Sequence, residues 1–130
     1  MQPSREVDYY VIASPTDAYF PGGVKPVSIW VSQKINRAAP GGTGFAKCGG
    51  NYAASLTAQT AAVAPRRAQV LFTDADEYQY LEELGGMTLS LVYALRRPAT
   101  PLLGDAILDC VTLRVFFAFP IYLRSHPDLR

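Results

Sequence analysis

The sequence predicts an α+β domain in which short strands accompany one clear helix. Residues 27–32 place Val27, Ile29 and Val31 at every second position, a period typical of a β-strand. Residues 51–64 are rich in alanine, start with an asparagine suited to an N-cap and are followed by Pro65, so they predict a helix. The 130 residues are enough for one domain with a single core.

The other elements follow from local composition. Residues 7–13 (VDYYVIA) are β-branched and aromatic and predict a buried strand, whereas residues 14–23, with two prolines and a Gly-Gly pair, predict a loop. Residues 37–50 form a glycine-rich loop. Residues 69–73 predict a strand and residues 74–76 a turn.

Two further patterns concern packing. In the predicted helix, one face carries Tyr52, Leu56, Gln59 and Val63. Residues 78–84 and 87–93 predict two strands joined at Gly85-Gly86 as a hairpin.

After Tyr93 the periodicity is poor and no element is assigned. An apolar cluster there fits either a core strand or an exposed, adhesive segment: Phe116, Phe117, Phe119, Ile121 and Tyr122.

Composition excludes several classes of function. A net charge of +1 gives no electrostatic case for binding nucleic acid or an anionic membrane. The N-terminus has no signal-peptide core, and the longest apolar run, residues 115–123, is interrupted by Pro120 and too short to span a bilayer. Two distant cysteines, Cys48 and Cys110, favour a reduced compartment over a disulfide scaffold. We therefore expect a soluble, cytoplasmic protein.

The most informative segment is the glycine-rich loop, where five of the ten glycines surround Lys47 within residues 41–50. A phosphate-binding P-loop is excluded at two positions, because Ala46 precedes the lysine and Cys48 follows it. Two interpretations stay open: a solvated surface lysine, and an amine that attacks an aldehyde, which requires surroundings that favour its unprotonated form. The apolar neighbours Phe45, Ala46 and Cys48 permit the second.

Several segments of the sequence resemble those of one known enzyme family. GGTGFAKCGGNYAASLTAQ resembles the cofactor-lysine segment of branched-chain amino acid aminotransferases, pyridoxal phosphate enzymes of fold-type IV. SPTDAYFPGGVKPVSIWVS resembles the interdomain loop and following strand of that family, and YLEELGGMTL resembles its E-E-x-G-G-M-N segment. The likeness runs from about Pro3 to about Tyr93. It implies the incomplete mixed sheet or barrel of the family's large domain, preceded by an interdomain segment.

The resemblance also implies roles for individual residues. Lys47 would form the internal aldimine with pyridoxal 5'-phosphate and carry a proton between the substrate α-carbon and the cofactor C4′. Tyr52 would hydrogen-bond the phenolic oxygen of the cofactor. Glu83 would pair with the pyridine nitrogen and keep it protonated, so that the ring accepts electrons. Each has a structural alternative: Tyr52 can simply pack, and alternation alone does not decide whether Glu82 or Glu83 faces solvent.

Three other residues are weaker candidates. Tyr19, in the interdomain loop, can line the substrate entrance or be an ordinary loop aromatic. Arg37 can serve only to satisfy loop carbonyl groups, and Cys48 is expected to be a small buried apolar residue.

The likeness is expected to end at Tyr93, which divides the chain into residues 1–23 (end of an N-terminal domain and interdomain loop), 24–93 (start of the lysine domain) and 94–130 (atypical tail). In the family, an N-terminal domain supplies an arginine to the cofactor phosphate, and no counterpart is recognised here. The implied reaction moves an amino group from leucine, isoleucine or valine to 2-oxoglutarate in enzymes that are usually homodimers. We expect this chain alone to be weakly active or inactive. The alternatives are a non-catalytic α+β remnant, a D-amino acid aminotransferase or an aminodeoxychorismate lyase.

Overall fold

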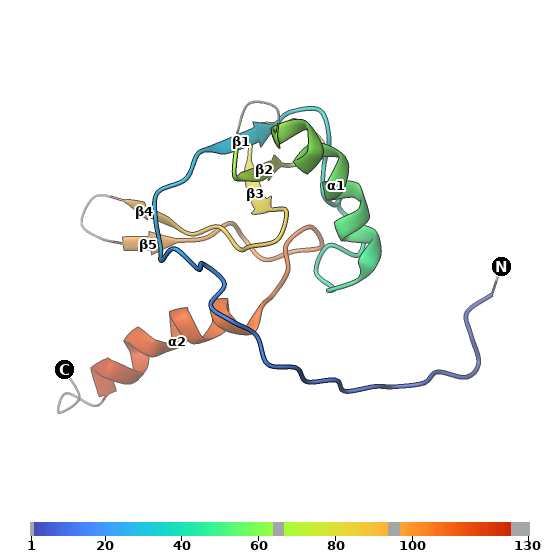
Figure 1. The fold of residues 1–130 in the computed structure, drawn as a ribbon, viewed down its shortest axis with the longest axis horizontal. Helices are drawn as coiled ribbons and strands as arrows, with labels where there is room; N and C mark the ends of the chain where they lie inside the picture. The colour runs from blue at the N-terminus through green and yellow to red at the C-terminus, as the bar shows by residue number, and fades with distance from the viewer. Residues whose placement is uncertain (1, 64–66, 94–96, 126–130) are drawn as a thin grey trace.

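A computed structural model describes residues 2–63, 67–93 and 97–125 of the chain (Figure 1). Its elements follow in the order β1 (Ile29–Ser32), α1 (Gly49–Val63), β2 (Gln69–Thr73), β3 (Leu81–Leu84), β4 (Leu91–Tyr93), β5 (Arg97–Ala99) and α2 (Val111–Ser125). Strands β1, β2 and β3 form one sheet in that order, and β4 and β5 form a separate ribbon. This mixture of helices and strands confirms the α+β prediction.

The three-stranded sheet is mixed because its two pairings differ in direction. β1 runs parallel to β2, with Ile29 opposite Gln69, and β3 runs antiparallel to β2, with Leu84 opposite Leu71. Two parallel neighbours require a crossover connection, and α1 lies within the one that joins β1 to β2. The predicted strand at residues 69–73 is confirmed, and the strand predicted at residues 27–32 is present over Ile29–Ser32.

The core lies between α1 and β2. Val70 and Phe72 of β2 are fully buried, as are Ala58 and Ala62 of the helix, and Trp30 and Ile35 pack against this cluster. The small alanine side chains let the helix backbone approach the sheet closely. Burial of these side chains fixes the position of α1 and therefore of the loop that leads into it.

One detail predicted for α1 is wrong, and its buried face is a finding of the structure. The helix begins at Gly49, so Asn51 lies in its first turn instead of capping it. The buried positions are Asn51, Ser55, Ala58 and Ala62, whereas Leu56 is 63% exposed. Both stripes satisfy helical spacing, and the structure buries the one whose small residues fit against β2. Pro65, the predicted stop, lies outside the described residues.

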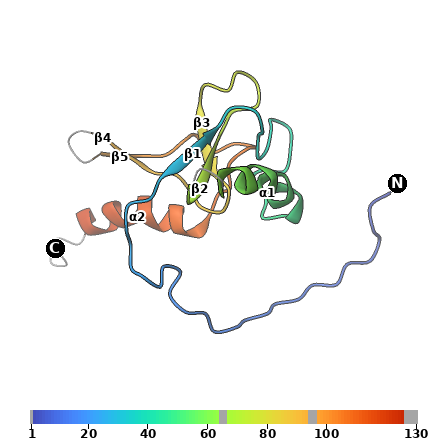
Figure 2. The same cartoon turned by 45° about the horizontal axis from the view of Figure 1, so that its top comes forward.

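The strand predicted at residues 7–13 is also wrong. Figures 1 and 2 show the N-terminal segment as a long arm leading away from the body, and its side chains are exposed, Tyr9 and Ile12 to 88%. A β-rich composition yields a strand only where a neighbouring strand pairs with it, and the described residues offer this segment none. The loop predicted at residues 14–23 is confirmed and turns at Gly23, which has a φ of 77°.

The predicted hairpin around Gly85-Gly86 is wrong as well. β3 pairs with β2, and β4 pairs with β5 in the second ribbon, so the two strands that flank these glycines are not partners. Gly85 donates its backbone N–H to Val70 O at 3.1 Å, which extends the contact with β2 instead. The apolar side chains of β3 gain more by joining the core sheet than by a local hairpin.

The segment left unassigned after Tyr93 contains β5 and α2. The core-strand alternative for its apolar cluster is wrong, because Phe116 and Phe117 lie in α2. Leu113 is buried, but Phe116 and Val115 are 48% and 59% exposed, and Figure 1 shows α2 extending away from the three-stranded sheet. Within the described parts of the chain, neither helix is long and apolar enough to cross a membrane.

The turn between β2 and β3 is organised by Asp74. Its carboxylate accepts backbone N–H groups of Glu77, Gln79 and Tyr80, each at 2.7 Å. These bonds lower the pKa of Asp74, that from Tyr80 most strongly. The turn predicted at residues 74–76 is therefore held by charge-assisted hydrogen bonds.

We predict that Asp74→Asn lowers the free energy of unfolding at neutral pH, because a neutral amide oxygen accepts these bonds more weakly. The folded-state pKa lies below the ordinary value of 3.8, so the advantage of the carboxylate is present above about pH 4 and is lost as the pH falls through the lowered folded value. Urea denaturation of both proteins across the acid range measures this. A stability difference that does not change with pH would contradict it.

Candidate functional site

One cavity of about 360 Å³ brings together residues from four parts of the chain. The glycine loop, the first turn of α1, the end of β3 with the turn after it, and the segment leading into α2 all contribute to its wall. Its polar lining consists chiefly of Arg37, Lys47, Tyr52, Glu83, Thr88, Ser90, Cys110 and Thr112. Its apolar lining includes Leu84, Met87, Leu108, Leu113 and Phe116. The cavity thus combines an amine, a phenol and a carboxylate with apolar surface.

The glycine loop is held in place by close backbone contacts. Gly41 has a φ of 72°, a conformation that favours glycine, and Phe45 donates its N–H to Asp105 O at 3.0 Å. At Gly44, an added Cβ would lie 2.4 Å from Asp105 O. The side chain of Asn51 donates to Thr43 O and Ala46 O, both at 2.7 Å, and ties the loop to the helix. Asn51 therefore acts as a clamp on the loop that carries Lys47.

Lys47 and Tyr52 meet at the mouth of the cavity. The Lys47 ammonium donates a hydrogen bond to Tyr52 Oη at 2.8 Å, and its Nζ lies 4.9 Å from the centre of the tyrosine ring. The lysine is exposed, whereas the tyrosine is partly buried in the first turn of α1. α1 begins at Gly49, between these two residues. The start of the helix therefore fixes the backbone positions from which the Lys47 and Tyr52 side chains meet.

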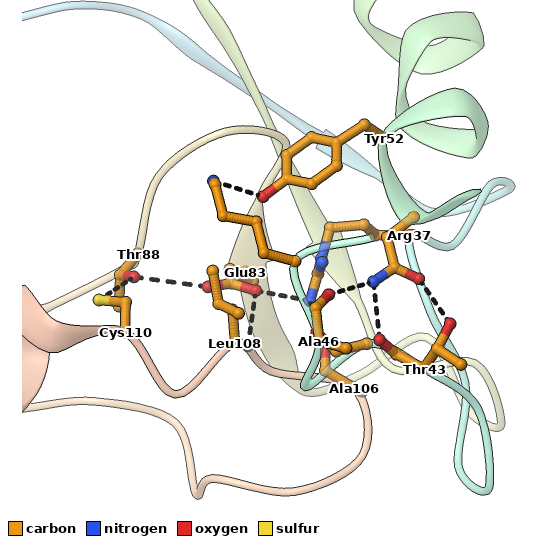
Figure 3. Close-up of polar contacts among 12 residues, drawn as sticks. Arg37, Thr43, Ala46, Tyr52, Glu83, Thr88, Ala106, Leu108 and Cys110 are labelled. Carbon is orange, nitrogen blue, oxygen red and sulfur yellow. Dashed lines mark hydrogen bonds and ion pairs between the residues drawn. The ribbon is translucent and has the colours of Figure 1, made fainter. Parts of the chain in front are cut away.

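Glu83 lies on the inner side of the same cavity and is only 4% exposed (Figure 3). Its Oε2 faces the Arg37 guanidinium at 2.5 Å and accepts the backbone N–H of Leu108 at 3.1 Å. Its Oε1 accepts a hydrogen bond from Thr88 Oγ1 at 3.4 Å, and that hydroxyl also contacts Cys110 Sγ at 3.4 Å. Glu82 lines a different cavity, of about 210 Å³. Of the two adjacent glutamates, Glu83 is the one at the Lys47 cavity.

Two opposing effects act on Glu83. Burial raises the pKa of this carboxyl, while the hydrogen bond from Leu108 and the positive charges of Arg37 and Lys47 act to lower it. The pKa of Glu82 is also raised, chiefly by burial and then by the charge of Asp74.

Two contributors to this site were not predicted from the sequence. For Arg37 the sequence left open a role limited to satisfying loop carbonyl groups. It does donate to Gly44 O and Ala106 O, but it also forms the ion pair with Glu83. The segment 104–110 received no element, yet it supplies Asp105 O to the loop and the Leu108 N–H to Glu83. These contacts join residues far apart in the chain, so no local pattern indicates them.

Two weaker candidates lie elsewhere. Tyr19 is 71% exposed, packs edge-to-face on Phe20 with ring centres 4.9 Å apart and does not line the cavity. Cys48, expected to be buried and apolar, is half-exposed, and the pKa of its thiol is lowered, mainly by the Thr43 hydroxyl. Both cysteines are free thiols.

Comparison with known proteins matches the chain to enzymes of one kind. It is 56% identical over 112 residues to a probable branched-chain-amino-acid aminotransferase of Streptomyces coelicolor, covering 86% of this chain and 31% of that protein. It is 50% identical over 115 residues to the branched-chain-amino-acid aminotransferase of Mycolicibacterium smegmatis, with the same coverage. Branched-chain-amino-acid aminotransferase 2 of Bacillus subtilis is 42% identical over 103 residues, which is 78% of this chain and 28% of that enzyme. No protein-family model matches the chain.

The three relatives named above are all aminotransferases. More narrowly, the chain is similar to a segment of branched-chain-amino-acid aminotransferases, which confirms the resemblance drawn from its motifs. The chain spans about a third of the length of the curated relatives it matches.

The comparisons also correct one expectation about the extent of the likeness. A match that covers 112 residues of this chain cannot be contained in residues 1–93, so it continues past Tyr93. The continuation includes part of the segment that borders the Lys47 cavity.

We predict that Gly44→Ala lowers the free energy of unfolding by about 1–3 kcal/mol, because the new methyl group overlaps Asp105 O and Ala38 Cβ, at 2.4 and 2.6 Å. Gly50→Ala is the matched control: no heavy atom lies within 4 Å of its added Cβ, and alanine in α1 favours the helix by about 0.5–1 kcal/mol. Chemical denaturation of the two variants checks the pair. Equal stability of Gly44→Ala and the wild-type chain would contradict the close contact.

Proposed function

We propose that the chain forms the lysine-bearing part of a pyridoxal phosphate site in a fold-type IV, branched-chain-amino-acid aminotransferase. The observation that carries the proposal is the arrangement of Lys47, Tyr52 and Glu83 around one cavity. The relatives' names, which are those of branched-chain-amino-acid aminotransferases, support the proposal independently of this geometry.

The side chains at the cavity fit the functional groups of pyridoxal phosphate. The cofactor has an aldehyde, a phenolic oxygen, a pyridine nitrogen and a phosphate, and the cavity presents an amine, a phenol and a carboxylate to the first three. Thr112 lies in the first turn of α2 and lines the cavity, so its hydroxyl and the helix N-terminus suit an anionic oxygen. A volume of about 360 Å³ is of the size that small-molecule sites have.

When bound, pyridoxal phosphate supplies a conjugated ring that takes up the electron pair left at the substrate α-carbon. Lys47 Nζ would bind the cofactor aldehyde covalently and, once released, would accept and return the α-proton as a general base. Tyr52 Oη, 2.8 Å from that amine, would orient it and hydrogen-bond the phenolic oxygen. Glu83, as a carboxylate, would hold the proton of the pyridine nitrogen in place.

The proposed substrates are branched-chain amino acids and the matching 2-oxo acids, both small molecules. Met87, Leu108, Leu113 and Phe116 give the cavity an apolar wall that suits an aliphatic side chain. The proposed amino acceptor, 2-oxoglutarate, rests on the family resemblance alone.

The test is chemical labelling of the lysine. Purified chain is incubated with pyridoxal phosphate and reduced with borohydride, and the modified peptide is mapped. The chain has three lysines, so Lys25 and Lys34 are internal controls. We expect the label on Lys47, its loss in Lys47→Arg, and little on the other two. Equal labelling of all three lysines, or none on Lys47, would overturn the proposal.

We further predict that Tyr52→Phe weakens pyridoxal phosphate binding by about tenfold. The substitution removes the hydroxyl that contacts Lys47 and that would donate to the phenolic oxygen of the cofactor, and a hydrogen bond to a charged group is worth about 1.5 kcal/mol. Fluorescence titration with the cofactor measures the affinity. Tyr80→Phe, at a residue that is 66% exposed and does not line the cavity, is the control and should leave the affinity unchanged. Identical affinities of Tyr52→Phe and wild type would remove Tyr52 from the site.

A further inference from the structure

The strongest feature at the cavity that the proposed roles do not use is the contact between Arg37 and Glu83. The two side chains are only 4% and 5% exposed, and the guanidinium nitrogen lies 2.5 Å from Glu83 Oε2. The same nitrogen donates to Gly44 O and Ala106 O (Figure 3). A guanidinium bound to two backbone segments has little freedom to move away from the carboxylate.

The two oxygens of Glu83 are in different situations. Oε2 receives both the guanidinium and the Leu108 N–H, at 2.5 and 3.1 Å. Oε1 has only the Thr88 hydroxyl, at a long 3.4 Å. Among the described residues, Oε2 is therefore anchored by two donors, and Oε1 has capacity for a further donor on the cavity side.

Charge explains why the anchor matters. A carboxyl buried this deeply favours its neutral form unless a positive charge lies close by. Among the described residues, the positive groups that act on Glu83 are Arg37 beside it and Lys47 at the same cavity, and the adjacent Glu82 carboxyl interacts with it as a like charge. The thiol of Cys110 reaches it only through Thr88. Arginine stays charged throughout the physiological range, so its effect does not vary with pH.

Resting on the proposed function, we propose that Arg37 is the positioning residue for Glu83: it keeps the carboxylate ionised and holds Oε2, so that Oε1 is directed to the ring nitrogen of the cofactor. Arg37 acts through Glu83 and does not itself need to touch the ring. Its two carbonyl contacts fix its position relative to the glycine loop and the segment 104–108.

The direct test does not require the cofactor. Carbon-13 NMR of the side-chain carboxyls follows the titration of Glu83 in the unliganded full chain, in Arg37→Gln and in Arg37→Lys. We expect the midpoint to rise by about one pH unit or more in Arg37→Gln and by less in Arg37→Lys, which retains the charge. Arg114→Gln is the matched control, since it removes an exposed arginine from its pair with Asp109 and should leave Glu83 unchanged. An unchanged midpoint in Arg37→Gln would overturn the inference.

A measurement on the wild-type chain covers the case in which Arg37→Gln does not fold. The side-chain N–H signals of Arg37 should shift with the same midpoint as the Glu83 carboxyl, because the two groups are in contact. Signals that stay constant while Glu83 titrates would overturn the inference without any variant.

The loaded protein provides the readout at the ring. Absorbance of the Lys47-linked cofactor is titrated in wild type and both variants. We expect the spectral midpoint to rise by about one pH unit in Arg37→Gln, because less positive charge remains at the ring nitrogen, and by less in Arg37→Lys. Borohydride labelling separates the two failures: no label on wild-type Lys47 defeats the proposed function, whereas a label with unchanged Glu83 and spectral midpoints defeats the role of Arg37 alone.

Discussion

The buried ion pair between Arg37 and Glu83 is the interaction on which the rest of the site depends. It connects the residue that precedes the glycine loop to β3, and through Gly44 O, Ala106 O and the Leu108 N–H it also includes the segment before α2. Removing one partner of such a pair leaves an uncompensated buried charge, at a cost of about 3–5 kcal/mol. Once the two charges are buried, separating them is costly, so the pair favours the arrangement in which these three segments meet around the cavity.

The site divides into a buried inner side and an exposed outer side. Glu83 is buried and anchored at Oε2 by Arg37 and the Leu108 N–H, while Lys47 is exposed and donates its hydrogen bond to Tyr52. This division suits the proposed chemistry, in which a carboxylate must keep a fixed position and an amine must bind, release and move a proton. The two sides are joined through the core, because α1 positions Tyr52 and β2 positions β3.

Local chemistry allowed part of this structure to be predicted. The strand β2 and the helix α1, to within two residues at its start, followed from composition and spacing. Motif resemblance singled out Lys47, Tyr52 and Glu83, which line one cavity, and their roles stay predictions. The strand partners did not, because Gly85-Gly86 signals a turn without indicating that β3 pairs with β2. The buried face of α1, with Asn51, Ser55, Ala58 and Ala62, was not predicted, because helical spacing alone does not decide which stripe meets β2. Arg37 was missed as a partner of Glu83 because an ion pair between distant residues has no periodic signature.

The central claim, that the Arg37–Glu83 pair holds the site together, is tested most directly by a double-mutant cycle on stability. Arg37→Met, Glu83→Gln and the double variant are compared with wild type by chemical denaturation, with Arg114→Met and Asp109→Asn as a cycle on an exposed pair. We predict a coupling energy of about 2 kcal/mol or more for the buried pair and below about 1 kcal/mol for the exposed one. Additive effects of the Arg37 and Glu83 substitutions, with coupling near zero, would contradict it.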